Sequence, residues 1–331
     1  MSFAHYIKEI GSGQSGARAL SEPDAYQLFS AILDGGVPDL ELGAILLAMR
    51  VKTEALDELL GFHRAAAERL HRLRSPYARL KPIVIPTYNG ARRQANLLPL
   101  LALTLQRFNI PVLLHGTLEG HGRVATAYIL RELGVMPQGS LTSAQRALDE
   151  DGLAFVPTAT IAPGLANLMS LRSRLGLRNS AHTIVKLIEP FVGECVRLVS
   201  VSHPAYLDKL REFFSATGAT ALLMRGTEGE AFANPKRRPQ IDYFEAGRAS
   251  VLFEAEVGSV KTLPALPESA DAVVTAAWIR ERLAGRAPIP YPIVNQLACC
   301  LFASGYTDDM NQAKAIAAIE IGGMAACLIV V

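Results

Sequence analysis

Cysteines are few in this chain, and long apolar runs are missing. The 331 residues include four cysteines, Cys195, Cys299, Cys300 and Cys327, with no CxxC spacing. A disulfide framework is therefore not expected, and a reducing cytoplasm fits this usage best. The first residues, MSFAHYIKEIG, lack the apolar core of a secretory signal. The apolar run Met324–Val331 is far too short to span a bilayer, so we expect a cytoplasmic protein with no membrane partner.

Motifs of several function classes are missing as well. The seven histidines show no metal-ligand spacing such as HExxH. Ser202-His203-Pro204 follows an apolar run, but no GxSxG surrounds it. Nothing resembles a zinc finger or the aromatic motif of RNA-recognition domains. The sequence therefore does not indicate a zinc hydrolase, a serine hydrolase or a reader of specific bases.

The composition and the periodicity indicate a globular α/β protein. Half of the residues are hydrophobic and 19% are charged, which is typical of a compact chain with one large or two medium domains. Residues 1–75 show helical periodicity only. Beyond the proline-containing linker Ser75–Pro82, strand and helix patterns alternate, which predicts a mainly parallel sheet. Strands are predicted at Ile83–Ile85, Val112–Leu114, Ala154–Pro157, Val196–Val201, Thr220–Met224 and Ser250–Phe253.

The N-terminal helices can be bounded by their capping signals. Ser21 precedes one helix, and Thr53 is predicted to cap another over Glu54–Leu73. His63 lies at the apolar edge of that second helix, and we interpret it as a hydrogen-bonded core residue rather than a ligand. The segment Leu40–Val51 is apolar nearly all round, so this helical section is also a candidate dimer contact.

The stretch Pro82–Gly116 forms a predicted strand–turn–helix–strand unit. Its turn, Tyr88–Gly90, lies between the strand Ile83–Ile85 and a buried helix over Asn96–Phe108. Such a turn points N–H groups outward, which favours phosphate binding. The phosphate is either that of a small substrate or that of a nucleic acid backbone.

Basic residues are unevenly distributed along the chain. The net charge is only +2, yet residues 64–93 hold eight basic residues and one acid, Glu68. No acid occurs between Asp151 and Glu189, and Lys236–Arg238 is a third basic cluster. This asymmetry favours a surface facing a polyanion, although solvated helix faces explain each cluster equally well. The candidate nucleic-acid-binding or anion-binding residues are Arg64, Arg69, Arg72, Arg92, Arg93, Arg172, Arg174, Arg178, Lys186, Lys236, Arg237 and Arg238.

Several segments, in order from Ile7 to Ala317, resemble the anthranilate phosphoribosyltransferase family. They include ELGAILLAMRVKTEALDELLGF, LMSLRSRLGLRNSAHTIVKLIEPF and VSVSHPAYLDKLREFFSATGATALLMRGTEGE. The resemblance implies the glycosyltransferase family 3 fold, like that of nucleoside phosphorylases. It implies a small helical domain of residues 1–77, joined by helices of about 163–190, and a larger α/β domain of residues 78–162 and 191–331. It also implies a homodimer formed through the helical domain.

The segments IVIPTYNGAR, GLRNSAH and GTEGEAFANP most resemble the YbiB-type branch, which is described as binding nucleic acid. The phosphate loop departs from the enzymes of the family. Their Gly-Thr-Gly-Gly-Asp loop for phosphoribosyl pyrophosphate corresponds to Pro86–Gly90, where two glycines are missing and a tyrosine intrudes. The degenerate loop comprises Thr87, Tyr88, Asn89, Gly90, Asn96, His115 and Gly116.

The magnesium pair of the family also differs, whereas its arginines are retained. The adjacent Asp-Glu pair of the enzymes corresponds to Glu228 and Glu230, which are weak metal candidates because a glycine separates them. An equal alternative is a turn with both glutamates facing solvent. Arg172 and Arg178 match the pattern Arg-x-x-Leu-Gly-x-Arg, in which the first arginine holds the anthranilate carboxylate. We expect no cofactor, and Mg²⁺ only in an active enzyme.

These observations predict a binder of DNA and RNA with low specificity. Contacts of Lys and Arg with backbone phosphates need no catalytic geometry, and no catalytic residue is assigned. The alternative is an active enzyme with an altered substrate, either a phosphoribosyltransferase using phosphoribosyl pyrophosphate or a nucleoside-phosphorylase-like pentosyltransferase.

Overall fold

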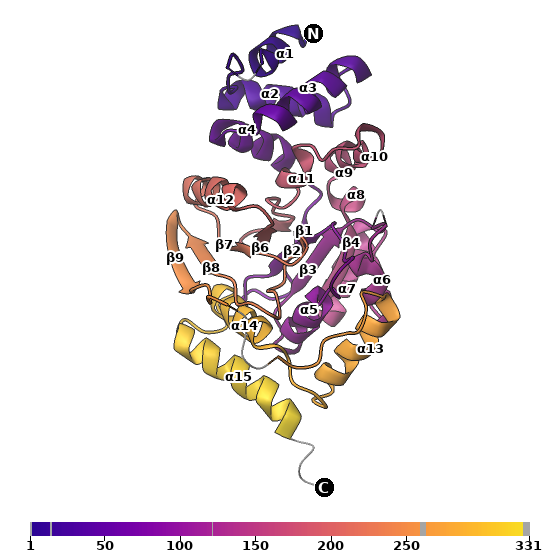
Figure 1. Ribbon diagram of the computed structural model, residues 1–331, viewed down its shortest axis with the longest axis vertical. Helices are drawn as coiled ribbons and strands as arrows, with labels where there is room; N and C mark the ends of the chain where they lie inside the picture. The colour runs from indigo at the N-terminus through magenta and orange to yellow at the C-terminus, as the bar shows by residue number, and fades with distance from the viewer. Residues whose placement is uncertain (1, 14, 121, 259–262, 327–331) are drawn as a thin grey trace. The chain divides into compact units, whose positions relative to one another are not determined.

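The computed structural model divides the chain into two compact units, each made of two segments (Figure 1). It describes residues 2–13, 15–120, 122–258 and 263–326, so the end of the apolar C-terminal run lies outside the described residues. The helical unit comprises Met1–Arg72 and Thr158–Pro190, and the α/β unit comprises Leu73–Pro157 and Phe191–Val331. The first boundary thus lies at Arg72, a few residues before the end of the 1–77 domain expected from the sequence.

The helical unit is organised around the packing of α2 against α4. Its helices are α1 Ala4–Gly11, α2 Glu22–Leu33, α3 Asp39–Lys52, α4 Leu56–Ala67, α8 Thr158–Ile161, α9 Pro163–Ser170, α10 Arg172–Leu175 and α11 Ala181–Ile184. Ser21 caps α2 by accepting the Asp24 N–H at 3.3 Å. Between α2 and α4 the rings of Phe29 and Phe62 stack at 4.5 Å.

The start and end of α4 differ from the prediction, and the predicted cap at Thr53 is wrong. Thr53 has φ 64 and follows α3, whereas α4 begins at Leu56. The buried carboxylate of Glu58 takes over the cap, because it accepts the Ala55 N–H at 2.8 Å and the Leu20 N–H at 2.9 Å. Beyond Ala67 the chain leaves the helix, so Arg69 and Arg72 lie on a loop.

His63 is a hydrogen-bonded residue of this unit, as predicted. Its Nε2 lies 3.1 Å from the carbonyl oxygen of Leu187, which belongs to the second segment of the unit. This contact between α4 and the residues after α11 helps to join the two segments.

A seven-stranded sheet forms the centre of the α/β unit, with the order β4-β3-β2-β6-β7-β8-β9. The strands are β2 Ile83–Thr87, β3 Val112–Gly116, β4 Leu153–Pro157, β6 Val196–Val201, β7 Ala221–Arg225, β8 Ile241–Glu245 and β9 Arg248–Phe253. The first five strands in this order are parallel, whereas β8 and β9 are antiparallel. The predicted mainly parallel sheet is therefore confirmed. The two short strands β1 Leu73–Arg74 and β5 Phe191–Val192 pair separately.

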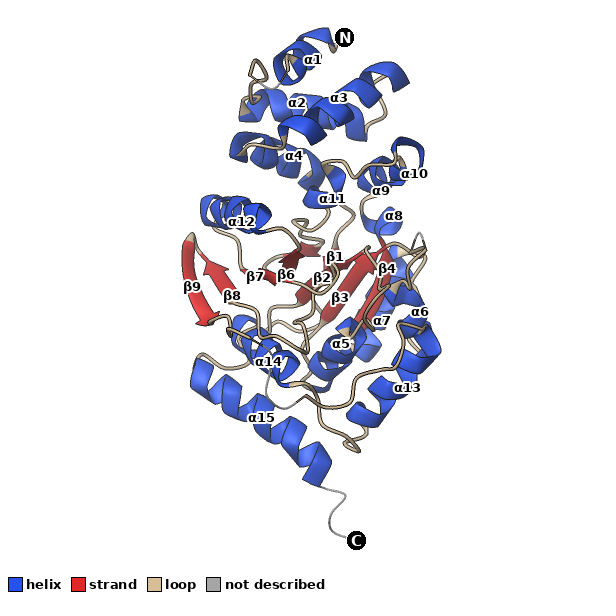
Figure 2. Cartoon of the chain, in the orientation of Figure 1, coloured by secondary structure: helices blue, strands red, loops and turns tan. Residues whose placement is uncertain are grey.

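Helices cover both faces of this sheet (Figure 2). They are α5 Leu98–Arg107, α6 Thr126–Glu132, α7 Leu141–Asp151, α12 Pro204–Thr217, α13 Ala272–Leu283, α14 Tyr291–Ala303 and α15 Met310–Ala326. Helix α12 and helix α14 both contact β7 and β8, from opposite faces of the sheet. Helix α5 is apolar nearly all round and is buried, as the sequence predicts. Within the described residues, every helix is too short or too polar to cross a bilayer.

The close packing of α2 against α4 leads to a prediction about stability. A Cβ at Gly61 would lie 2.5 Å from the Glu22 carbonyl oxygen and 2.7 Å from the Tyr26 nitrogen, both in backbone. We expect Gly61→Ala to lower the free energy of unfolding by about 1–3 kcal/mol through overpacking. Thermal unfolding of the full chain, followed by circular dichroism, measures the effect as a lower Tm.

Gly139→Ala is the matched control for Gly61→Ala. A Cβ at Gly139 would meet no atom within 4 Å, and the residue lies outside the left-handed region. Its Tm should be unchanged or slightly higher. Equal Tm values for the two variants would contradict the proposed close contact.

Candidate functional site

The turn that follows β7 packs against the loop that follows β2. The carboxylate of Glu230 lies beneath the loop and is 1% exposed. Its Oε1 accepts the N–H groups of Asn89 and Gly90 at 2.8 and 2.7 Å, and its Oε2 accepts the hydroxyl of Thr87 at 2.5 Å. One buried carboxylate therefore accepts hydrogen bonds from three donors of the predicted phosphate loop.

Glu228 occupies the next part of the same loop. Its Oε1 accepts the N–H groups of Arg93 and Gln94 at 2.8 Å each, and its Oε2 accepts that of Arg92 at 3.1 Å. The side chain is 15% exposed, and Arg123 Nη1 lies 3.5 Å from Oε2. The alternative in which both glutamates face solvent is therefore wrong, because each is turned inward to backbone donors.

Asn89 and Gly229 hold the turn against the loop. Asn89 Nδ2 donates to the carbonyl oxygen of Gly229 at 2.7 Å. Gly229 has φ 91, and a Cβ there would lie 2.8 Å from Asn89 Nδ2. Only glycine meets both conditions without strain, so the glycine that separates the two glutamates is what allows the turn to approach the loop.

A buried polar network lies below the loop. The hydroxyl groups of Thr87 and Thr126 are hydrogen bonded to each other, and Asn96 Nδ2 donates to Thr126 Oγ1 at 2.7 Å. Asn96 Oδ1 also accepts the Leu98 N–H at 3.0 Å, at the start of α5. Asn96 is thus a structural residue at this helix start. Thr126 was missed from the sequence because its segment carries no motif and only the fold brings it here.

The remaining residues of the predicted loop are packed rather than open. Gly116 approaches β2 so closely that a Cβ would lie 1.6 Å from the Thr87 carbonyl oxygen. Complete burial lowers the pKa of His115 to about 3, so its ring is neutral at physiological pH and offers no charge to a phosphate. The structure brings the seven predicted residues together, and every one of them is buried: Thr87, Tyr88, Asn89, Gly90, Asn96, His115 and Gly116.

The residues at this loop do not fit a magnesium ion. Hard cations need carboxylate oxygens with free lone pairs pointing into one cavity. The oxygens of Glu228 and Glu230 instead face N–H and hydroxyl donors, whose partial positive charge opposes a cation. Among the residues that the structure describes, no group of three or more His, Cys, Asp or Glu side chains is placed to hold a metal. No chemical step is therefore assigned to Mg²⁺ here.

Two of the predicted basic clusters meet beside this loop. Arg93 and Lys236 line the same cavity of about 110 Å³, together with Gln94, Pro235 and Glu268. Their neighbours Arg92 and Arg237 are also exposed. Arg238, the last residue of the Lys236–Arg238 cluster, is hydrogen bonded to the backbone: its Nε donates to the Glu254 carbonyl oxygen at 3.1 Å. No ion pair joins Arg92, Arg93, Lys236 or Arg237 to another described residue.

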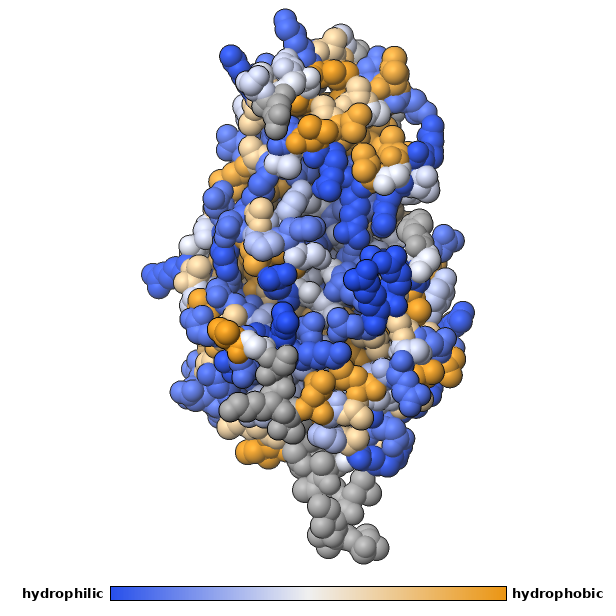
Figure 3. All heavy atoms as spheres, in the orientation of Figure 1, coloured by the Kyte–Doolittle hydropathy of each residue, from blue (hydrophilic) through white to orange (hydrophobic). Residues whose placement is uncertain are grey.

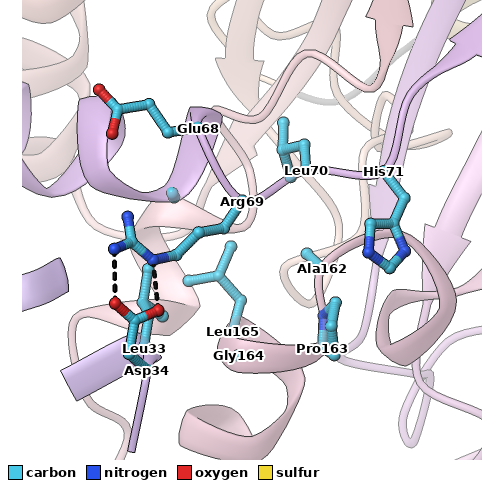
Figure 4. Close-up of a pocket in the computed structure, with 11 residues that line it drawn as sticks. Leu33, Asp34, Glu68, Arg69, Leu70, His71, Ala162, Pro163, Gly164 and Leu165 are labelled. Atoms are coloured by element: carbon cyan, nitrogen blue, oxygen red, sulfur yellow. Dashed lines mark hydrogen bonds and ion pairs between the residues drawn. The ribbon is translucent and has the colours of Figure 1, made fainter. Parts of the chain in front are cut away.

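Arginines of the helical unit are paired with acids that lie far away in sequence. Arg69 binds Asp34 through two hydrogen bonds of 2.7 and 2.6 Å, beside a cavity of about 370 Å³ that His71 and Leu165 also line (Figure 4). These bonds hold the pKa of the Asp34 carboxyl below its usual value. Arg64 pairs with Glu22 at 3.3 Å, and its guanidinium lies over the ring of Tyr26.

The basic residues of the second helical segment gather around His182. Burial, together with the positive charges of Arg178, Arg172 and Lys186, lowers the pKa of His182 to about 3. These three predicted residues therefore share one neighbourhood of the helical unit. Arg174 lies apart from them and pairs with Asp39 at 3.4 Å, while Arg72 is exposed on the loop after α4.

Comparison with known proteins places these features in a family. Residues 4–70 match the helical bundle domain of the glycosyl transferase family. The chain is 45% identical over 306 residues to the uncharacterized protein YbiB of Escherichia coli, covering 92% of this chain and 95% of that protein. It is 25% identical over 325 residues to anthranilate phosphoribosyltransferase of Rhodospirillum rubrum, covering 96% and 93%.

Solved structures confirm the fold. Anthranilate phosphoribosyltransferase from Thermus thermophilus superposes with a TM-score of 0.73 at 23% identity, over 97% of this chain and 96% of the enzyme. The enzyme from Saccharomyces cerevisiae, in complex with PRPP and Mg, gives 0.69 at 14% identity, over 98% and 94%. The chain therefore belongs to the family of Escherichia coli YbiB, on the scaffold of the anthranilate phosphoribosyltransferases.

Proposed function

We propose that this protein binds nucleic acid, DNA or RNA, without sequence specificity, through contacts of Lys and Arg with backbone phosphates. The observation that carries the proposal is the cluster formed by Arg92, Arg93, Lys236 and Arg237, which we call the basic cluster. Its four side chains are exposed, two of them line one cavity, and none forms an ion pair with another described residue. They are available to an external polyanion.

The chemistry of the basic cluster suits a phosphate backbone. Guanidinium groups bind phosphate oxygens in bidentate fashion, and a lysine adds a flexible point charge. Neutralising backbone phosphates releases counterions, which supplies most of the affinity of non-specific binding. By contrast Arg64, Arg69 and Arg174 have acidic partners already, so a phosphate must compete with a carboxylate there. The neighbourhood of Arg172, Arg178 and Lys186 is a second candidate surface.

The fold favours the alternative function, an active pentosyltransferase, but the loop after β2 does not. Transfer from phosphoribosyl pyrophosphate requires the leaving pyrophosphate to be held and neutralised. Here Glu228 and Glu230 place two negative charges on the N–H donors that would do so. A non-catalytic role without a cofactor therefore accords better with this loop.

We also propose a cytoplasmic homodimer formed through the helical unit. Helix α3 exposes Leu40, Leu47 and Val51, and Leu40 is 83% exposed. These residues recur along one side of the helix, and apolar surface lies over α3 (Figure 3). A second copy of the chain would cover this face and would double the number of basic clusters per particle.

Charge reversal tests the basic cluster. We expect Arg92→Glu with Arg93→Glu to weaken binding to both single- and double-stranded DNA and RNA, in electrophoretic shift assays at two salt concentrations. If about six phosphates are neutralised, the affinity of the unaltered protein falls on the order of a thousandfold between about 50 and 200 mM salt. The double variant should have both a lower affinity and a shallower salt dependence.

Arg146→Glu with Arg248→Glu is the control for this charge reversal. Both residues are exposed in the α/β unit, and the variant carries the same net charge as the other. Its binding should stay close to that of the unaltered protein. Binding that does not depend on salt, or an equal loss in both variants, would refute the assignment. An effect of Arg172→Glu with Arg178→Glu alone would move the site to the helical unit.

Calorimetry tests the enzyme alternative. We expect titration with phosphoribosyl pyrophosphate, with and without Mg²⁺, to give no saturable heat at micromolar concentrations, because the loop donors are already occupied. Active anthranilate phosphoribosyltransferase from a relative serves as the positive control. Micromolar binding that requires Mg²⁺ would favour the enzyme.

Sedimentation velocity tests the dimer. Leu40→Glu with Leu47→Glu places two carboxylates in the proposed apolar contact, so we expect a shift from dimer to monomer. Val273→Glu introduces a carboxylate at an exposed apolar residue of α13 and should leave the dimer intact. A monomer for the unaltered chain would contradict the proposal.

A further inference from the structure

We propose that the Glu228 carboxylate is an internal ligand of an anion-binding nest formed by the N–H groups of Arg92, Arg93 and Gln94. Without that carboxylate, the nest binds a phosphate oxyanion. This inference goes beyond nucleic acid binding and does not depend on it, since it concerns backbone donors rather than the side chains of the basic cluster.

The geometry of the nest is that of an oxyanion site. Three consecutive N–H groups converge on the two oxygens of one carboxylate, at 2.8, 2.8 and 3.1 Å. Successive N–H groups that point to one side form a concave region of positive potential, which takes phosphate in many proteins. The nest lies before α5, which begins only at Leu98, so it is a feature of the loop rather than of a helix end.

The charges around the nest favour an anion whether or not Glu228 is present. The guanidinium of Arg123 is 3.5 Å from Glu228 Oε2, and its Nη1 also lies 3.5 Å from the Gly90 carbonyl oxygen. The exposed side chains of Arg92 and Arg93 start from the same backbone. Loss of the carboxylate leaves Arg123 and three donors without their anion, and hydrogen bonds to an ionised acceptor are among the stronger ones.

The nest is held in place independently of the Glu228 side chain. Ala91, directly before it, exchanges two backbone hydrogen bonds with Val124, at 2.9 and 2.7 Å. Glu230 fixes the preceding residues through Asn89 and Gly90. Shortening Glu228 therefore empties the nest without removing the contacts that shape it.

The turn that carries Glu228 is equally well fixed. Thr227 and Glu230 exchange backbone hydrogen bonds of 3.2 and 3.0 Å, and Thr227 Oγ1 donates to the Phe232 carbonyl oxygen at 3.1 Å. Glu228 itself has φ 53, a conformation that side-chain-bearing residues adopt at a cost. The hydrogen-bonded turn thus fixes the backbone from which the Glu228 carboxylate reaches the nest. A surface glutamate on a loop without such bonds would have no fixed position there.

The test uses inorganic phosphate as the probe and the full chain as the protein. Calorimetry and thermal unfolding are recorded for the unaltered chain, Glu228→Ala and Glu212→Ala, with sodium chloride at equal ionic strength as the reference. Glu212 is an exposed glutamate of α12, so Glu212→Ala matches the change in charge but leaves the nest filled. We expect a phosphate association constant at least about tenfold higher for Glu228→Ala than for the other two proteins, because three charge-assisted donors become available. Of the three proteins, only Glu228→Ala should show a Tm that rises with phosphate concentration.

A second variant keeps the outcome decisive. Glu228→Gly empties the nest and relieves the left-handed backbone, so it should fold at least as well as Glu228→Ala. Phosphate binding by Glu228→Ala or Glu228→Gly, absent from the unaltered chain and from Glu212→Ala, supports the proposal. If a folded Glu228 variant binds phosphate no more tightly than the unaltered chain, the proposal is wrong.

Discussion

The position of the loop after β2 is set by hydrogen bonds between two carboxylates and the backbone of that loop. Glu228 and Glu230 together accept five N–H groups and one hydroxyl from residues 87–94. The chain thus supplies the anions for these donors itself. The loop is thereby fixed and buried by hydrogen bonds within the chain. The exposed arginines that follow it are presented from rigid backbone.

This arrangement separates two kinds of anion recognition. The backbone N–H groups at the carboxyl edge of the sheet are hydrogen bonded to carboxylates of the chain itself. The side chains of Arg92 and Arg93 are exposed to solvent. A small substrate needs the first kind, because its phosphate must be enclosed. A long polyanion needs only the second kind, because it crosses the surface and is held by many weak contacts. The proposed function follows from which of the two is still available.

Much of the architecture was predictable because it depends on local patterns. The buried strands at Ile83 and Val112 and the apolar helix between them are short-range features, and the structure confirms them. The prediction of the α4 cap was wrong because the carboxylate that accepts the Ala55 N–H belongs to Glu58, which lies inside the helix rather than before it. The ion pairs of single arginines could not be predicted for another reason. A basic cluster is defined by neighbours in sequence, whereas Asp34 is a neighbour of Arg69 only in the folded structure. The inward turn of Glu228 likewise requires two segments more than a hundred residues apart, which no local pattern reveals.

The division of the helical unit into two segments affects how it folds during synthesis. Its two segments, Met1–Arg72 and Thr158–Pro190, are separated by the strands β2, β3 and β4. On the ribosome, α1 to α4 therefore emerge long before α8 to α11, and the contact between His63 and Leu187 cannot form in the interval. The α4 surface that faces the second segment stays uncovered while three of the seven strands are synthesised. Completion of the helical unit thus waits until residues 158–190 have been translated, and a fragment that ends near residue 77 would lack the Leu187 partner of His63.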